Sequence, residues 1–483
     1  MNRLAAGMTG VVVVLGAAWA GLAGWTGYRL EREIQASLQQ PLALPALGTL
    51  SLLSYQRGWL TSQARYRLTL TPDAGTQQTS GIPTAFDIDA TLAHGPWPLA
   101  RLREAALAPV LARAIAQPVQ QAAWQPWFAV SGGVAPLTVT ADLAYTGTVS
   151  FQANLAAIQI RQPEGQLTTS GARITGQATP GLQQLQLQGQ LAEARVVSRL
   201  PTPDGGTAPT ELRLTNVHWH SQQQRGLYGL YPGDAELRVG RLEIDTRDDQ
   251  GQPLPVVAHQ YQMRVDLTEN APYVSGLLDY RVDQVSLAQV ELGEIEAAFR
   301  FERLHGPTLR DSVQRYQALM HTLADGQLVP EAREPAFQDW FEHSWRALLP
   351  HQPVFALDPL RWELPQGRSW LQIQAQFQPP QGTGPLASIA NLDARLVVSR
   401  PMATEVLARL SQLPGGSGLD LEQARAAASL NVAFLQRLAL ASGYVVADQD
   451  ALMAHLRLAD GRLSLNDRPV PVPDDWAPLL NLP

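Results

Sequence analysis

An uncharged segment near the amino terminus constrains this chain more than any other feature. Residues 4–28 contain no Asp, Glu, Lys or Arg, whereas Arg3 precedes them and Arg29 follows them. About 20 consecutive apolar residues are enough for a helix to cross the hydrocarbon core of a bilayer. Trp25 and Tyr28 lie at the distal end of the segment, where membrane helices commonly carry aromatic residues. The segment therefore predicts a transmembrane helix that anchors a large water-facing body.

A cleaved signal peptide is the alternative interpretation of the same segment. Signal peptides have an apolar core of about 7–15 residues that ends at a small-x-small cleavage site. Ala18-Trp19-Ala20 would serve as such a site, but the apolar run continues past it to Tyr28. This continuation favours an uncleaved signal anchor that comprises residues 1–28, and cleavage stays open as the alternative.

The arginines around the segment indicate its orientation. Positive residues are enriched on the cytoplasmic side of membrane helices. Arg3 favours a cytoplasmic amino terminus, and Arg29 and Arg32 on the other side compete with it. On balance we expect a single-pass protein of the bacterial inner membrane. Residues 4–28 would hold it in the membrane, with the bulk of the chain in the periplasm.

Composition limits both the architecture and the chemistry. A chain of 483 residues with 45% hydrophobic residues is long enough for two or three packed domains. It has no cysteine, so disulfides, thiol catalysis and Cys-ligated metals are excluded. It has no lysine either, which excludes lysine-dependent chemistry. The net charge is −7 and no basic patch stands out, so nucleic acid is not an expected partner.

Alternating apolar and polar residues dominate the body of the chain. Such period-two alternation is typical of half-buried strands, and it is clear in residues 65–70, 86–92 and 371–378. Turn-rich linkers between the segments favour antiparallel pairing. We expect further strands over residues 137–145, 149–160, 165–178, 182–198, 210–220, 235–245, 256–267, 273–288, 292–302 and 394–399, a hairpin over 456–465 and a loop over 72–84.

Helical periodicity appears in a few places. We expect helices over residues 99–115, 309–323, 335–349, 402–413 and 421–442, and a short continuation of the anchor over 29–44. Pro330 is expected to separate the second and third of these helices. After the anchor, the elements form a first strand and helix section (29–130), a β-rich middle section (131–305) and a carboxy-terminal α+β section (306–483). His94-Gly95-Pro96 and His305-Gly306-Pro307 each follow a predicted strand, which leaves an internal duplication open.

Two histidines form the most distinctive candidate for a metal site. His218 and His220 lie on one face of a predicted strand, and Asp234 or Glu236 could supply a further ligand. A pair of surface histidines beside a packed Trp219 is the favoured interpretation. The sequence also lacks a nucleophile elbow, a phosphate-binding loop, a zinc-protease motif and a dinucleotide fingerprint. We therefore assign no catalytic, cofactor-binding or metal-binding residue and expect no cofactor.

Other patterns have simpler explanations than chemistry. Asp87 with Asp89, and Glu294 with Glu296, are carboxylate pairs that could do acid/base work, but solvated strand faces commonly carry such pairs. The helix over residues 335–349 carries a stripe of Trp340, Phe341, Trp345 and Leu348. Helical spacing predicts that this stripe packs against a sheet.

Several short stretches together resemble the YdgA-like family, a bacterial family of unknown function anchored in the inner membrane. The stretches are Gly24-Trp25-Thr26-Gly27-Tyr28, residues 55–62 (YQRGWLTS), His94-Gly95-Pro96, Asp358-Pro359-Leu360, Asp393-Ala394, Ser442-Gly443-Tyr444 and residues 460–466 (DGRLSLN). Their order and spacing cover nearly the full chain. Trp59 and Asp467 depart from the family's pattern, which has a smaller apolar residue and a glycine there. The resemblance implies an anchored envelope protein and brings no known catalytic residues.

These observations predict a mainly β (α+β) fold with a long antiparallel sheet, packed helices and one amino-terminal transmembrane helix. Curvature of the sheet into a groove is one form of this fold. The expected function is non-catalytic, because an open sheet has an apolar face that a lipid or another apolar ligand could cover. The likeness in form to envelope lipid-bridge proteins is an analogy of fold alone. A scaffold or interaction module, dimeric through its sheet edges, is the alternative, and an envelope hydrolase is the least favoured.

Overall fold

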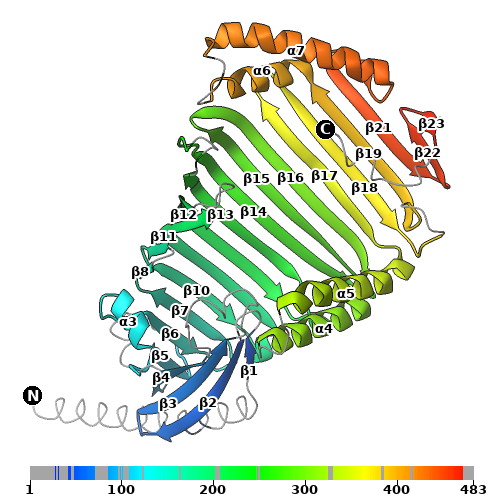
Figure 1. Ribbon diagram of the computed structural model, residues 1–483. Helices are drawn as coiled ribbons and strands as arrows, with labels where there is room; N and C mark the ends of the chain where they lie inside the picture. Colours follow the sequence, from blue (N-terminus) through cyan, green and yellow to red (C-terminus); the bar gives the residue numbers. More distant parts are fainter. Residues whose placement is uncertain are drawn as a thin grey trace, which may run out of the picture. The chain divides into compact units, whose positions relative to one another are not determined.

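The computed structural model describes residues 28, 31, 42–44, 48–70, 85–95, 98, 101, 108–121, 124–162, 165–201, 207–245, 247, 251–324, 330–381, 386–413, 416 and 418–471. The predicted anchor lies outside the described residues except for Tyr28, and so does the loop expected over residues 72–84. Among the residues that the structure describes, no helix is both long and apolar enough to span a membrane. The fold is mainly β with few helices, as predicted (Figure 1).

Contacts between residues divide the chain into two compact units. Unit 1 comprises Met1–Arg161, Leu167–Ala192 and Met320–Gln327, and unit 2 comprises Gln162–Gln166, Glu193–Leu319 and Leu328–Pro483. Each unit is built on an antiparallel sheet, and among the described strands neither sheet closes on itself. The boundaries expected from the sequence at residues 130 and 305 stay predictions.

Unit 1 pairs its strands in the order β1-β2-β3-β4-β5-β6-β7-β10-β11. The short helix α3 (Gln125–Val130) precedes β6, and the 3-10 turn η1 (Pro180–Leu182) precedes β11. The strands are β1 (Leu42–Leu44), β2 (Gly48–Arg57), β3 (Thr61–Leu70), β4 (Ala85–His94), β5 (Ala112–Pro118), β6 (Leu137–Leu143), β7 (Val149–Leu155), β8 (Ile158–Gln162), β9 (Gly165–Thr169), β10 (Ala172–Ala178) and the first part of β11 (Gln184–Pro201).

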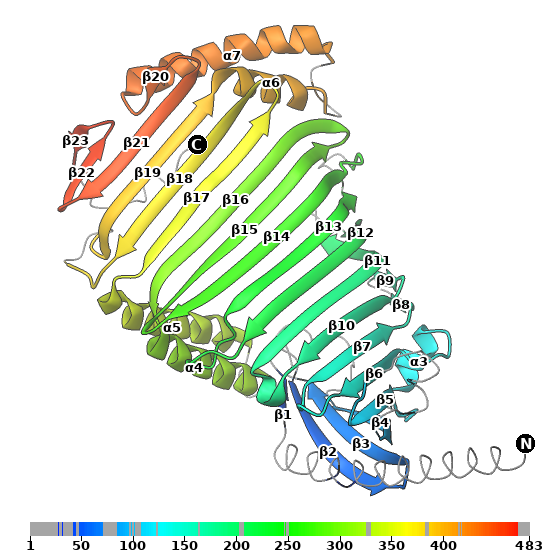
Figure 2. The same ribbon diagram turned by 180° about the vertical axis from the view of Figure 1, so that it is seen from behind.

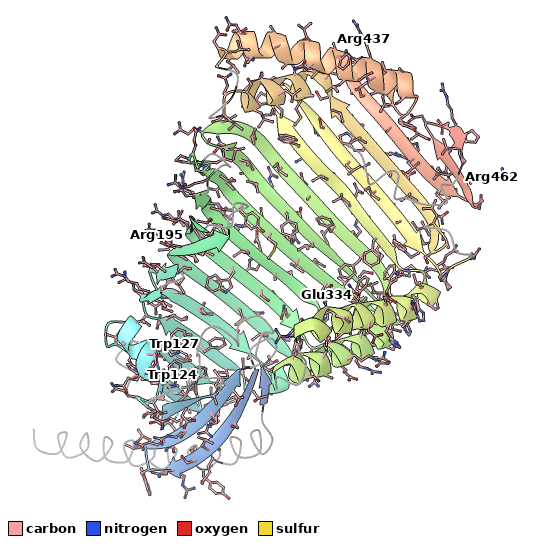
Figure 3. All side chains as sticks on the ribbon, viewed as in Figure 1. Trp124, Trp127, Arg195, Glu334, Arg437 and Arg462 are labelled. Atoms are coloured by element: carbon pink, nitrogen blue, oxygen red, sulfur yellow. The ribbon has the colours of Figure 1, made fainter. Side chains whose placement is uncertain are left out.

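The core of unit 1 lies on one face of β3, β4 and β5. Trp124, labelled in Figure 3, precedes α3. It packs against Phe86 with a distance of 4.7 Å between ring centroids. Its indole N–H donates a hydrogen bond to the backbone carbonyl of Asp87 at 3.1 Å. The buried cluster consists of Ala64, Ala90, Leu92, Leu111 and Ala112. Small and aliphatic side chains thus fill the space over neighbouring strands.

Two helix predictions for unit 1 are wrong where the structure describes them. Residues 112–115, expected within a helix over 99–115, belong to strand β5. Alanine favours helix intrinsically, but tertiary context routinely overrides this weak preference. Here β5 pairs with β4 on one side and β6 on the other, and Ala112 is 2% exposed. Residues 42–44, expected in a helix over 29–44, pair with β2 as strand β1.

Unit 2 pairs its strands in the order β12 to β19, then β21, β22 and β23, and β20 also pairs with β21. The strands are β12 (Thr207–Gln224), β13 (Gly233–Asp245), β14 (Val256–Asn270), β15 (Tyr273–Leu287), β16 (Val290–His305), β17 (Val354–Leu364), β18 (Gly367–Phe377), β19 (Ile389–Ser399), β20 (Val446–Asp448), β21 (Ala451–Ala459), β22 (Arg462–Leu465) and β23 (Arg468–Val470).

Two pairs of helices lie at opposite ends of the unit 2 strands (Figures 1 and 2). The pair α4 (Gly306–Ala324) and α5 (Pro330–Leu348) follows the end of β16 and leads through the 3-10 turn η2 (Leu349–His351) into β17. The pair α6 (Arg400–Leu410) and α7 (Leu421–Ser442) follows the end of β19. Strands β16 and β19 run in opposite directions, so they end at opposite ends of the strands. The two helix pairs are therefore separated by the length of the strands.

Strand β17 is a strand that the alternation of the sequence does not predict. Its pairing with β18 shifts in register between Leu357 and Leu360. The apolar positions therefore change from odd to even numbers across Asp358-Pro359, and a count of period two fails where an irregularity moves the pattern by one residue.

Pro330 also differs from expectation, because it begins α5 instead of preceding the helix. Proline fits the first turn of a helix, where its missing N–H has no partner to lose.

The predicted carboxy-terminal hairpin is confirmed. Leu456 and Leu458 of β21 oppose Leu465 and Leu463 of β22. Asp460 and Gly461 at the turn have φ angles of 51° and 71°, which is the left-handed backbone that a two-residue hairpin turn requires. The strands at residues 273–288, 292–302 and 371–378 are likewise found close to their expected positions.

Candidate binding face of unit 2

One side of the unit 2 sheet is apolar from strand to strand. Directly opposed residues of antiparallel strands project from the same side of a sheet, so register partners define rows across it. We call two neighbouring rows the open rows. The first contains Trp219, Leu237, Met263, Tyr280, Ala297, Leu360, Leu371, Leu396 and Ala454, and the second contains Val265, Leu278, Phe299, Leu357, Ile373, Ala394 and Leu456.

Several side chains of the open rows are exposed to solvent. Phe299 is 46% exposed, Leu360 38% and Leu396 39%. In both ribbon views the helix pairs leave the middle of β15–β18 uncovered, and Figure 3 shows side chains standing on these strands between the two pairs. Within the described part of unit 2, the open rows therefore present apolar surface to water.

Helix α6 covers the apolar side of the sheet at one end of the strands. Met402 and Val406 of α6 form a buried cluster with Leu364 at the end of β17, and Trp362 packs against it. Ser399 caps the helix, since its hydroxyl accepts a hydrogen bond from the backbone N–H of Met402. The aliphatic face of α6 is thereby held against the sheet.

Helix α5 covers the other end of the strands with part of the predicted packing stripe, whereas Trp340 of the stripe packs against Tyr316 of α4 with 5.1 Å between ring centroids. Trp345 of α5 packs against Phe355 of β17 and Phe377 of β18, with distances between ring centroids of 5.8 and 4.9 Å. Leu348 is buried as well, whereas Phe341 is 60% exposed. The stripe thus contacts the sheet through its last turns, and Phe341 lies outside this contact.

The opposite side of the sheet carries charges that neutralise one another. Nη2 of Arg361 lies 3.0 Å from Oε1 of Glu294, and the same guanidinium contacts Glu296. Nη2 of Arg281 lies 3.3 Å from the same Glu294 oxygen. The predicted carboxylate pair is therefore held between two arginines.

The carboxylate pair of unit 1 is neutralised in the same manner. Arg67 donates to both oxygens of Asp87 at 2.7 and 3.0 Å, and Arg65 donates to both oxygens of Asp89 at 2.6 and 3.0 Å. The hydrogen bonds from Arg67 hold the pKa of Asp87 below its usual value against the opposing effect of burial. Each aspartate thus forms a cross-strand ion pair between β3 and β4.

The predicted histidine pair lies on the charged side of the sheet. Nε2 of His220 is 3.3 Å from Oδ2 of Asp234, and its Nδ1 is 3.3 Å from Oε2 of Glu236. His218 has Arg238 as its register partner instead. Both ring nitrogens of His220 thus face carboxylates, and among the described residues no group of three or more His, Asp or Glu side chains is arranged to hold a metal.

Comparison with known proteins places the chain in a family. The family described as "Bacterial protein of unknown function (DUF945)" matches residues 1–473. The chain belongs to this family. Two relatives from Escherichia coli (strain K12) are similar along most of their length: Protein YdgA is 23% identical over 98% of this chain and 97% of its own, and the uncharacterised protein YihF is 22% identical over 95% of both. No solved structure matches the chain significantly.

The YdgA-like resemblance predicted from short motifs is therefore confirmed, and two of those motifs meet in unit 1. Oγ of Ser62, at the end of the Tyr55–Ser62 stretch, lies 3.2 Å from Nε2 of His94. A serine and a histidine at this separation can form a nucleophile and base. Both side chains are 1% exposed, however, and burial raises the pKa of the neighbouring Tyr55 hydroxyl. In this DUF945 chain the contact joins β3 to β4 inside the unit 1 core.

Sequence reasoning missed this contact and the extent of the open rows. Ser62 and His94 are 32 residues apart, and their one sequence signal was that both lie in stretches that resemble the family. The open rows follow from register and from where the helices pack, which local alternation does not specify. No catalytic function is indicated for the family.

Proposed function

We propose that this protein binds acyl chains of lipids on the open rows of unit 2, as a non-catalytic protein anchored in the bacterial inner membrane. The observation that supports this proposal is the exposed apolar surface of Phe299, Leu360 and Leu396 between two helix-covered ends. Soluble surfaces rarely expose contiguous apolar patches unless they meet a ligand, a membrane or a partner.

The dimensions of the open rows suit an elongated apolar molecule. Neighbouring strands lie about 4.8 Å apart, so the row from Trp219 to Ala454 is roughly 40 Å long. Each methylene that leaves water contributes about 0.8 kcal/mol. An acyl chain lying along the row would therefore gain affinity with every strand it crosses. The charged network of Arg281, Glu294 and Arg361 keeps the other side of the sheet solvated.

The membrane anchor is the second part of the proposal. Residues 4–28 are uncharged and long enough to span a bilayer, and Arg3 favours a cytoplasmic start. The body would then work in the periplasm, next to a source of lipid. Protease added to spheroplasts should degrade the body of the full chain, and protection of the body would contradict this orientation.

We propose a non-catalytic role because the candidate catalytic residues are either paired with arginines or buried. Asp87, Asp89 and Glu294 are bound by arginines, and Ser62 with His94 is buried. The ion pairs and the burial give these groups structural roles in the two sheets.

Photocrosslinking at neighbouring positions tests the lipid proposal. A photoreactive phenylalanine analogue would replace either Phe299 on the apolar side or Arg300, which is also exposed and is the register partner of Ala356 on the charged side. The full chain would be irradiated in cell membranes and analysed by mass spectrometry. Phospholipid adducts at 299 and not at 300 are expected. Equal adducts, or none at 299, would contradict the proposal, and crosslinks between chains would favour the scaffold alternative.

A further inference from the structure

The turn between β2 and β3 in unit 1 exposes large apolar side chains. Trp59 is 70% exposed and Leu60 is 37% exposed. The turn is tight, because a Cβ atom on Gly58 would lie 2.3 Å from the carbonyl oxygen of Thr61. Glycine at this position lets the chain reverse and present Trp59 at the tip. We call residues 58–60 the hairpin tip.

The hairpin tip lies beside the residues that follow the predicted anchor. Nη1 of Arg57, the residue before the tip, is 3.1 Å from Oε2 of Glu31. Its guanidinium carbon is 5.6 Å from the centre of the Tyr28 ring. Tyr28 ends the uncharged segment and Glu31 lies three residues further along, and both of these residues have helical backbone. One turn of helix rises about 5 Å, so these contacts place the base of the tip at the level where the anchor would leave the bilayer.

We propose that the hairpin tip docks into the interface of the lipid bilayer beside the anchor. This inference rests on the anchor in the proposed function and adds a second membrane contact to it. Tryptophan is enriched at the headgroup level of membranes, because its ring is apolar and its N–H is polar. Leu60 adds aliphatic area next to it. The occupant is therefore a lipid surface, because the membrane segment proposed over residues 4–27 continues directly into Tyr28.

Charge around the tip indicates which lipids matter. Arg57 is paired with Glu31, so this arginine is already engaged and is a weak site for anionic headgroups. Docking should therefore depend on the apolar side chains at 59 and 60. Vesicles of phosphatidylcholine and vesicles that contain phosphatidylglycerol are expected to bind the tip alike.

The register of unit 1 supplies a matched control at the far end of the same strands. Thr61 next to the tip opposes Ala93, and Ala93 opposes Arg113. The last residues of β4 and the first residues of β5 therefore lie at the same end of the sheet as the tip. Val134 precedes β6, whose first residues oppose the other end of β5. Val134 is 57% exposed and lies three residues before β6, whose seven residues extend over about 23 Å.

Site-directed labelling of the full chain tests the proposal, and the absence of native cysteine makes it direct. Single-cysteine variants Trp59→Cys, Leu60→Cys and Val134→Cys would carry an environment-sensitive fluorophore. Each protein would be reconstituted in phosphatidylcholine vesicles with lipids that bear a quencher near the headgroup. The variant Leu60→Cys keeps Trp59. It therefore measures docking even if loss of the indole in Trp59→Cys weakens the contact with the bilayer. Ala17→Cys, inside the predicted anchor, reports on the anchor separately.

The expected result is a blue-shifted, strongly quenched signal at 59 and 60 and an unquenched signal at 134. An unquenched, water-like signal at both 59 and 60 would overturn the proposal. A blue-shifted signal at 17, at the middle of the predicted anchor, would in that case leave the anchor supported, so failure of the tip is distinguishable from failure of the proposed function. Equal quenching at 134 and 60 would also overturn it, because contact would then not be specific to the tip.

Discussion

The ends and the middle of the apolar side of unit 2 are built from the same residue types but differ in what covers them. Leu364 at the end of β17 is 5% exposed under α6, where Met402 is 1% exposed. Leu360 lies on the same strand and is 38% exposed. Two leucines of one strand are therefore buried in one case and accessible to solvent in the other.

This difference separates two roles that hydrophobic residues take in the sheet. At the ends, aliphatic and aromatic side chains pack against α5 and α6 and hold the sheet and helices together. In the middle, the same kind of surface stabilises the fold less, because water still contacts it. Substitutions at the ends should therefore act on stability, and substitutions in the middle should act on binding.

The largest effect is expected from Leu364→Ala, which removes a buried side chain under α6. Large-to-small changes in a packed core cost about 2–4 kcal/mol in free energy of unfolding. The matched change Leu360→Ala should cost less than about 1 kcal/mol, because this residue is already partly solvated. Urea unfolding of the full chain in mild detergent, followed by tryptophan fluorescence, measures both. Equal losses would show that the middle is packed as tightly as the end.

The cover at the α6 end should also loosen in acid. Glu405 of α6 is 4% exposed and accepts hydrogen bonds from Arg425 at 2.8 and 3.0 Å and from Arg409 at 2.7 Å. The bonds from Arg425 are the main reason that its pKa falls from 4.5 to about 2. The folded pKa is depressed, so its stabilising effect is present above pH 4.5 and is lost as the pH falls toward about 2. The loss is at most about 3 kcal/mol.

Hydrogen exchange of the α6 and α7 amides at a series of pH values measures this effect. In Glu405→Gln, protection should already be reduced at neutral pH and should change less between pH 5 and pH 2 than in the unmodified protein. Because other carboxylates also have lowered pKa values, the difference between the two proteins is the relevant quantity. An identical pH dependence would contradict the assigned role of Glu405.

A charge placed in the middle should separate binding from stability. Leu360→Glu adds a carboxylate next to Phe299 without filling a buried space, so the free energy of unfolding should change by less than about 1 kcal/mol. With the photoreactive analogue at position 299, lipid adducts should fall several-fold. Leu360→Met, which conserves the apolar surface, is the matched control. If both variants gave unchanged adducts, the open rows would not be the binding surface.

The smallest effect is expected on the charged side behind the open rows. Arg281→Gln removes the contacts of a half-exposed arginine with Asp283 and Glu294. Exposed ion pairs are worth about 0.2–1 kcal/mol and weaken with salt. Urea unfolding at low and high salt should show a small loss that shrinks at high salt, with lipid adducts at 299 unchanged. A large loss would show that the two sides do not divide the roles as described.

The sequence predicts most strands because alternation is a local property. Leu371, Ile373 and Ala375 alternate with glutamines in an unbroken run, and β18 is found there. The same rule fails at β17, because the register shift at Asp358-Pro359 moves the apolar positions by one. It fails at β5 as well, because the pairing of Ala112 with β4 and β6 outweighs its preference for helix.

The sequence predicts that the sheet has an apolar side, but it does not predict which part of that side is uncovered. An open sheet with one apolar side follows from strands of alternating residues, but which part stays uncovered depends on where α5 and α6 pack. Trp345 was identifiable as a packing residue, whereas its partners Phe355 and Phe377 lie on strands after it in the chain. Long-range contacts of this kind need the register of the whole sheet.

The short strands that end the unit 2 sheet have a consequence for solubility. An open sheet with a long free edge is a template for aggregation, because its unpaired N–H and C=O groups recruit further strands. In the described residues, β20 and β23 each have three residues, and β23 has Pro469 at its centre. Proline has no N–H to donate, so this edge offers few hydrogen bonds to an incoming chain. The sheet can thus be extensive without polymerising.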